Sequence, residues 1–210
     1  MKRLTISILA LTLCAFSAFA QTADEIVTRM EKELEKHDDS EGMTMTVDVK
    51  MPILGTISTK SYILGEKVRM EVKAAGTTVI TWTDNVTDWV YMSKTNELTI
   101  SDSKPNSSDS GSGSEMDMFD GLTDGYTVSI KKEDDTSWYI SCKKRKDNKE
   151  KDDPKNIDLV VRKADYYPTS LSASVSGMKM TIRDIAFGVS EETVTFHNDD
   201  CPGAKIIDKR

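Results

Sequence analysis

The sequence contains little of the chemistry on which enzymes depend. Its 2 histidines, His37 and His197, lie among acidic residues near the ends of expected elements, as solvated surface histidines do. No serine lies in a nucleophile turn, and no glycine-rich phosphate loop follows a strand. Acidic pairs such as Asp134-Asp135 lack the spacing of a calcium loop. We therefore expect a protein that is not an enzyme and has no catalytic residue, no metal site and no cofactor.

Cysteine is scarce as well. The chain has 3 cysteines, and only Cys142 and Cys201 lie beyond the N-terminal segment. They form neither a CxxC motif nor a zinc-ligand pattern. A lone pair can form a disulfide in an oxidising compartment. The sequence does not show whether the two side chains lie close together, so a disulfide and two free thiols both remain possible.

Long apolar runs are absent except at the N-terminus. A basic start, Met1-Lys2-Arg3, precedes the apolar run Leu4–Leu13 and the small-x-small motif Ala18-Phe19-Ala20. This pattern predicts a signal peptide over residues 1–20, cleaved after Ala20, and therefore export to the periplasm. Lipidation at Cys14 is the competing interpretation, which the bulky residue before that cysteine disfavours.

The remaining chain, residues 21–210, is predicted to form a single domain with an acidic surface. The net charge of −7 becomes −9 once Lys2 and Arg3 are removed. Such a balance argues against nucleic-acid binding and against firm docking on anionic lipid. The mixed-charge run Lys143–Asn156 fits a solvated turn better than a phosphate site. We expect a monomer that no segment anchors in a membrane.

One helix comes first in this domain. Thr22 and Glu25 form a capping box, and Ile26, Met30 and Leu34 follow at a spacing of four residues. This pattern predicts an amphipathic helix that ends near His37 and packs its apolar face on another element.

The pattern then changes to the alternation of β-strands. About eleven strands are expected over residues 43–51, 56–64, 67–73, 77–83, 88–92, 97–100, 126–132, 136–143, 157–164, 168–176 and 178–187. Short connections predict an antiparallel meander, and a parity change at Arg183-Asp184 predicts a bulge. Short helical turns are expected at 115–122 and 190–195. The run Ser101–Ser114 is interpreted as a flexible connector, with a lid as the alternative.

Nearly every expected strand is apolar on one face only. One helix and a short apolar segment cannot cover so large a sheet. The simplest solution is a mainly β fold, a strongly curved sheet with an apolar concave face and the helix across its mouth. The 11 methionines suit either core filling or a surface that adapts to varied apolar ligands.

Three groups of residues resemble the periplasmic lipoprotein carriers, the LolA/LolB-like group that includes RseB-type lipid-sensing domains. The turn Asp84-Asn85 before Trp89-Val90-Tyr91 resembles the family's turn and Trp-x-Tyr strand. The strand Val68–Val72 resembles its third strand, and Phe196, Pro202-Gly203-Ala204 and Ile206-Ile207-Asp208 resemble its C-terminus. The resemblance implies an unclosed barrel of about eleven strands.

The resemblance also implies a periplasmic chaperone that shields acyl chains and carries lipoproteins to the outer membrane. Its partners would be acylated lipoproteins, an inner-membrane release complex and an outer-membrane acceptor. The basic residue and proline that these carriers place before the third strand are absent at Gly65-Glu66, so that release role is not carried over. The expected lipid-binding residues are Ile26, Met30, Leu34, Met43, Met45, Val47, Val68, Met70, Val72, Trp89, Tyr91, Met178 and Met180. The alternatives are a lipid-sensing or protein-interaction module without transport, and a structural envelope protein with a filled barrel.

Overall fold

The computed structural model describes residues 21–37, 40–53, 55–103, 119, 121–151, 153–175 and 177–210. The expected signal peptide, most of the serine-rich run and most of the expected helical turn at 115–122 lie outside these residues. Within the described part of the chain, no helix is long and apolar enough to cross a membrane.

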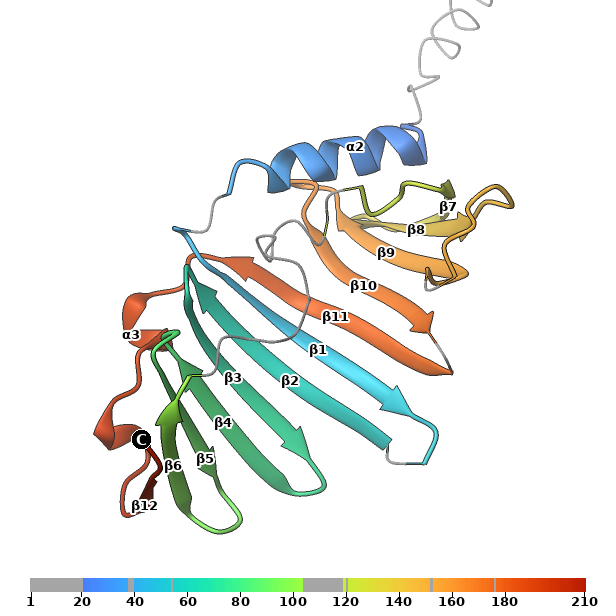
Figure 1. The fold of residues 1–210 in the computed structure, drawn as a ribbon. Helices are drawn as coiled ribbons and strands as arrows, with labels where there is room; N and C mark the ends of the chain where they lie inside the picture. Colours follow the sequence, from blue (N-terminus) through green and yellow to red (C-terminus); the bar gives the residue numbers. More distant parts are fainter. Residues whose placement is uncertain are drawn as a thin grey trace, which may run out of the picture.

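Twelve strands form one sheet, which Figure 1 shows together with its few helices. The strands are β1 (Met43–Met51), β2 (Gly55–Leu64), β3 (Lys67–Ala74), β4 (Thr77–Thr83), β5 (Thr87–Met92), β6 (Glu97–Asp102), β7 (Tyr126–Glu133), β8 (Ser137–Lys144), β9 (Asn156–Arg162), β10 (Pro168–Val175), β11 (Met178–Phe187) and β12 (Lys205–Asp208). The helices are α2 (Ala23–Leu34), α3 (Glu191–Val194) and η2 (Asn198–Asp200).

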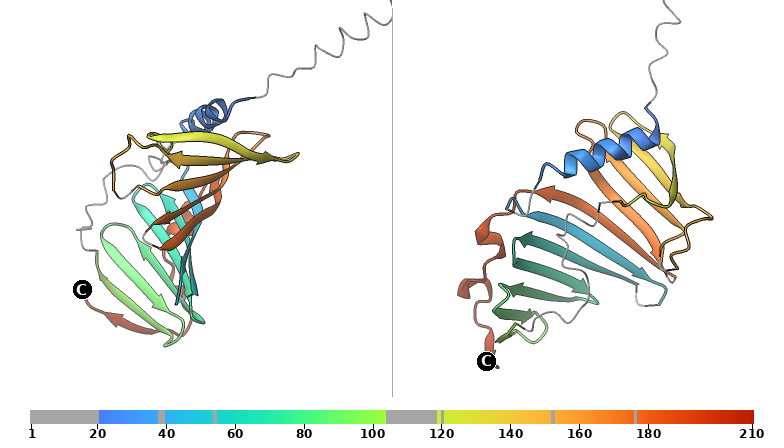
Figure 2. Two further views of the ribbon diagram at one scale, coloured as in Figure 1. Left: turned by 90° about the vertical axis from the view of Figure 1, so that its right-hand side faces the viewer. Right: turned by 45° about the horizontal axis from the view of Figure 1, so that its top comes forward.

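The sheet order is β12-β6-β5-β4-β3-β2-β1-β11-β10-β9-β8-β7. Neighbouring strands are antiparallel except β12, which pairs in parallel with β6. The two edge strands, β12 and β7, do not pair with each other, so the sheet is not closed. Figure 2 shows its strong curvature. The expected curved, unclosed sheet is therefore confirmed, with β12 as one strand more than expected.

Turn residues with positive φ set the register of the hairpins. Ala75 and Gly76 have φ of 47° and 77°, and this two-residue turn places Val72 opposite Val79. Asp184 has φ of 56° at the expected bulge, where the pairing of β1 with β11 shifts register. The bulge keeps apolar side chains on one face of β11 on both sides of the shift.

The two faces of the sheet are covered by different parts of the chain. We call the face under α2 the helix side and the face under the C-terminal segment 190–204 the tail side. The helix lies over one end of the sheet, at β7 to β11, and the tail runs along the opposite end (Figure 2). The expected short helix near the C-terminus is confirmed as α3, which Ser190 caps.

Candidate binding face

The N-terminal helix forms one apolar core with the helix side of the sheet. The Thr22 Oγ1 accepts the Glu25 N–H at 3.2 Å and the Glu25 carboxylate accepts the Thr22 N–H at 2.9 Å, so the capping box is confirmed. The apolar stripe of the helix is buried, with Ile26 and Met30 each 0 % exposed. Met43 and Met45 of β1 belong to the same core.

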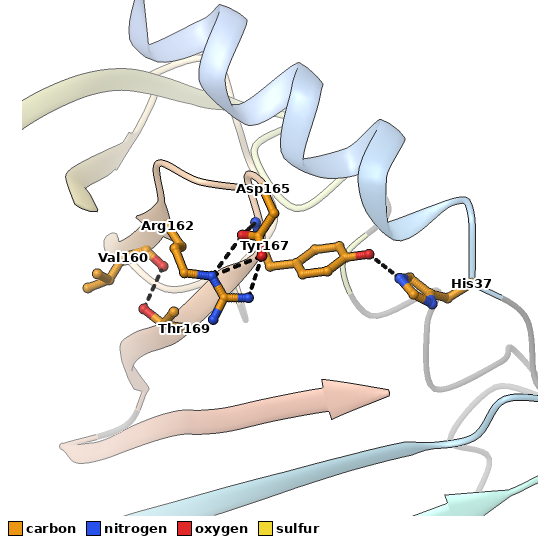
Figure 3. Close-up of polar contacts among 6 residues, drawn as sticks. All are labelled: His37, Val160, Arg162, Asp165, Tyr167 and Thr169. Carbon is orange, nitrogen blue, oxygen red and sulfur yellow. Dashed lines mark hydrogen bonds and ion pairs between the residues drawn. The ribbon is translucent and has the colours of Figure 1, made fainter. Parts of the chain in front are cut away.

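The C-terminal end of α2 is attached to the sheet through His37 (Figure 3). Its ring stacks on Phe187, with centroids 3.9 Å apart and 4° between the planes. One ring nitrogen, Nδ1, lies 2.6 Å from the Glu41 carboxylate, and the other contacts the Tyr167 hydroxyl. His37 is therefore a packed anchor, and the expectation of a solvated surface histidine is wrong for this residue.

The turn that presents Tyr167 is itself held by an ion pair. Arg162 donates to both carboxylate oxygens of Asp165 at 2.6–3.0 Å, and this contact lowers the pKa of that carboxyl. On the same turn, the Tyr166 hydroxyl accepts a hydrogen bond from Arg29 of α2 at 2.9 Å. Polar contacts thus fix the helix over β9 and β10 along its length.

The apolar helix side continues beyond the strands that α2 covers. The pairing register places one further set of side chains on this face, across β1 to β5 and β11. We call this set the open wall: Val49, Ile57, Val68, Met70, Val72, Val79, Val90, Met92, Met178 and Met180. Met70, Met92 and Met178 are 36 %, 40 % and 41 % exposed, so the wall is accessible. Small polar residues such as Thr59 and Thr81 lie between its members.

A second aromatic core lies on the tail side. Trp82 is 2 % exposed and pairs across the hairpin with Trp89. Phe196 of the tail stacks on Trp89 with centroids 5.3 Å apart, and lies edge-on to Trp82 at 5.4 Å. Cys201 completes this core.

The structure therefore divides the expected lipid-binding residues into three groups. Ile26, Met30, Leu34, Met43 and Met45 form the core between helix and sheet, and Val47 packs against it. Val68, Met70, Val72, Met178 and Met180 belong to the open wall. Trp89 and Tyr91 lie on the tail side. These two aromatic residues were expected among the lipid-binding residues, but they lie on the face opposite Met70, because alternate residues of a strand face opposite sides of a sheet.

Sequence reasoning missed two parts of this arrangement. Five members of the open wall were not among the expected lipid-binding residues, and the alternation within their strands was the available signal: Val49, Ile57, Val79, Val90 and Met92. The tail-side cover by Phe196 had no local signal, since more than a hundred residues separate that side chain from Trp89.

The two cysteines are free thiols on opposite faces of the sheet. Cys142 of β8 lies in the helix-side core and Cys201 in the tail-side core, so of the two alternatives the disulfide is excluded. Burial raises the pKa of the Cys142 thiol to about 11 and also raises the pKa of Cys201. Both side chains behave as small apolar residues.

Solved structures align with this chain at low sequence identity. LprF from Mycobacterium bovis aligns with a TM-score of 0.56 at 11 % identity, over 84 % of this chain and 96 % of LprF. The lipoprotein LppX from Mycobacterium tuberculosis aligns with a TM-score of 0.49 at 10 % identity, over 78 % and 94 %. A LolA superfamily protein from Nitrosomonas europaea aligns with a TM-score of 0.31 at 10 % identity, over 84 % and 99 %.

No protein-family model and no curated protein matches the sequence. The likeness to LprF, at 11 % identity, thus concerns the fold alone.

Proposed function

We propose that this protein binds acyl chains on its open wall and acts as a carrier of lipids or lipoproteins in the periplasm. One observation carries the proposal: the helix covers only part of the apolar helix side, and the remainder exposes methionine and valine side chains. A face of this size and composition is otherwise buried in a soluble domain.

The composition of the wall suits flexible hydrocarbon. Burial of each acyl methylene group contributes about 0.8 kcal/mol, so an acyl chain is retained without polar recognition. Methionine side chains are unbranched and polarisable, and they adapt to chains of different length. Binding of this kind needs no catalytic group, so we assign the protein to carriers rather than enzymes.

Delivery of lipoproteins to the outer membrane is the role that the sequence resemblance implies. The expected signal peptide would place the mature chain, residues 21–210, between the two membranes. A cargo held by apolar contact alone can pass to an acceptor with a stronger apolar site, since no covalent or ionic bond must break.

A fluorescent fatty-acyl probe tests this proposal directly. We expect the mature chain to bind the probe, and Met70→Glu with Met92→Glu to weaken binding at least tenfold, because a carboxylate on the wall must lose its hydration. The control is Ile206→Glu, which places one carboxylate at a residue that is 62 % exposed on the tail side. Equal loss of binding in this control, or no binding by the unmodified chain, would refute the proposal.

A further inference from the structure

One end of the sheet combines an exposed apolar residue with several lysines that form no ion pair with the other described residues. The hairpins β1–β2 and β10–β11 both turn there, and their tips are neighbours because β1 pairs with β11. The described residues of the β8–β9 loop, 145–151 and 153–155, lie at the same end, on the right of Figure 1. We call this region the hairpin end.

Two lysines face each other at the hairpin end. Lys50 of β1 lies directly opposite Lys179 of β11, and both are exposed on the tail side. Their outer cross-strand neighbours are Thr56 and Ser174, so no carboxylate interrupts the row. Like charges directly opposite on paired strands destabilise a sheet. Repulsion between the two lysines therefore reduces the stability of the isolated protein, and an anionic partner would remove this repulsion.

Further cations surround this pair. A groove of about 540 Å³ beside Lys179 is also lined by Lys151 and Lys155. Two carboxylates of the described residues line it. Asp158 pairs with Lys131 at 2.6 Å, whereas Asp153 accepts a hydrogen bond from the neutral Asn148 amide at 2.8 Å and keeps its negative charge.

The carboxylate of β1 that lies nearest to Lys50 already forms an ion pair. Asp48 accepts a hydrogen bond from Arg183 at 2.7 Å, and this contact lowers its pKa. Residues 145–155 contain five basic and four acidic residues, so together with Lys50 and Lys179 the hairpin end carries a small excess of positive charge within a chain of net charge −7. Net charge alone led to the expectation that the protein avoids anionic lipid. That expectation did not consider how the charges are distributed over the surface.

An apolar side chain projects from the same place. Ile53 lies in the β1–β2 turn and is 94 % exposed. Val86, at the opposite end, is also 72 % exposed, but it lies between Asp84 and Asp88. Among these exposed residues, Ile53 has cationic neighbours and Val86 has anionic ones.

We propose that the hairpin end docks on the surface of an anionic phospholipid bilayer. Ile53 enters the interface between head groups and acyl chains, while Lys50, Lys179 and the lysines of the groove contact lipid phosphates. A projecting apolar tip among cations fits a membrane interface, which accepts such a tip without a preformed pocket. This inference concerns surfaces other than the open wall and does not depend on acyl-chain binding.

Vesicle flotation tests the proposal with the mature chain, residues 21–210. We compare vesicles of phosphatidylcholine alone with vesicles that contain phosphatidylglycerol, at low and high salt. We expect binding only to the anionic vesicles and a loss of binding in high salt. Lys50→Gln with Lys179→Gln should lower the partition coefficient about 30-fold. Ile53→Ser should lower it about tenfold.

Matched variants at other surfaces serve as controls. Lys32→Gln with Lys209→Gln removes the same charge elsewhere, and Val86→Ser removes another exposed apolar side chain, which is 72 % exposed. Both variants should leave the partition coefficient unchanged. Equal loss in these controls would overturn the proposal, as would equal binding to neutral vesicles. So would binding to polyglutamate without binding to anionic vesicles, which would assign the surface to an acidic polypeptide. Binding of the acyl probe should be retained in every variant, which separates this test from that of the open wall.

Discussion

Truncation of Phe196 to alanine tests the assignment of the aromatic residues to the tail side. This side chain is half-buried and contacts two tryptophans, with centroids 5.3 Å from Trp89 and 5.4 Å from Trp82. Full burial makes such a truncation cost about 3–5 kcal/mol, and partial exposure reduces this to about 2–3 kcal/mol, including the aromatic contacts. For a chain of this size the melting temperature should fall by about 5–10 °C.

The assay is thermal unfolding of the mature chain, followed by circular dichroism and tryptophan emission. Emission should shift to longer wavelength in native Phe196→Ala, because water reaches Trp82 and Trp89, whereas Trp138 stays in the helix-side core. The control Ile206→Ala alters an exposed tail-side residue and should change neither quantity.

The acyl probe gives the decisive comparison. Phe196→Ala should bind the probe as the unmodified chain does, because the open wall lies on the other face of the sheet. An unchanged emission spectrum, or a loss of probe binding as large as that of the Met70→Glu double variant, would refute the assignment of faces.

Three further predictions concern the core, a turn and the thiols. Met30→Ala should destabilise the protein by about 2–5 kcal/mol in urea unfolding, because the removed side chain is 0 % exposed; a loss below 1 kcal/mol would contradict the helix-side core. Hydrogen bonds from the Thr136 N–H and hydroxyl lower the pKa of Asp134 to about 2. Its contribution to stability is therefore complete above the unfolded pKa near 3.8 and is lost as pH falls toward 2, so Asp134→Asn should reduce stability at pH 5 and have little effect below pH 2. Cys142 and Cys201 should resist alkylation at pH 8 in the native protein and react after unfolding, whereas rapid native labelling would contradict their burial.

The fold was largely predictable because its signals are local. The capping box, the alternating strands and the parity change at Arg183-Asp184 each depend on a few neighbouring residues. The short connections then limited the topology to an antiparallel meander. The parallel strand β12 could not be predicted in this way, since it pairs with a strand more than a hundred residues earlier.

The candidate site was predicted less well, because turn lengths determine which side chains share a face of the sheet. Trp89 and Tyr91 were correctly placed on one face of their strand, but that face was matched to the wrong face of the neighbouring strands. The two-residue turn Ala75-Gly76 puts Val72 opposite Val79, which leaves Trp82 on the other face. Strand register, derived from turn lengths, would have separated the tryptophans from the methionines.

The order of the elements along the chain has a consequence for folding. Helix α2 precedes every strand, yet its core partners include β8 to β10, which come more than a hundred residues later. Strand β6 gains its last neighbour only from β12, the final strand. Both cores therefore close late, through contacts of high sequence separation, and such topologies fold slowly. Until those contacts form, Trp82 and the edge of β6 lack their native cover, and exposed strand edges and apolar surface favour aggregation.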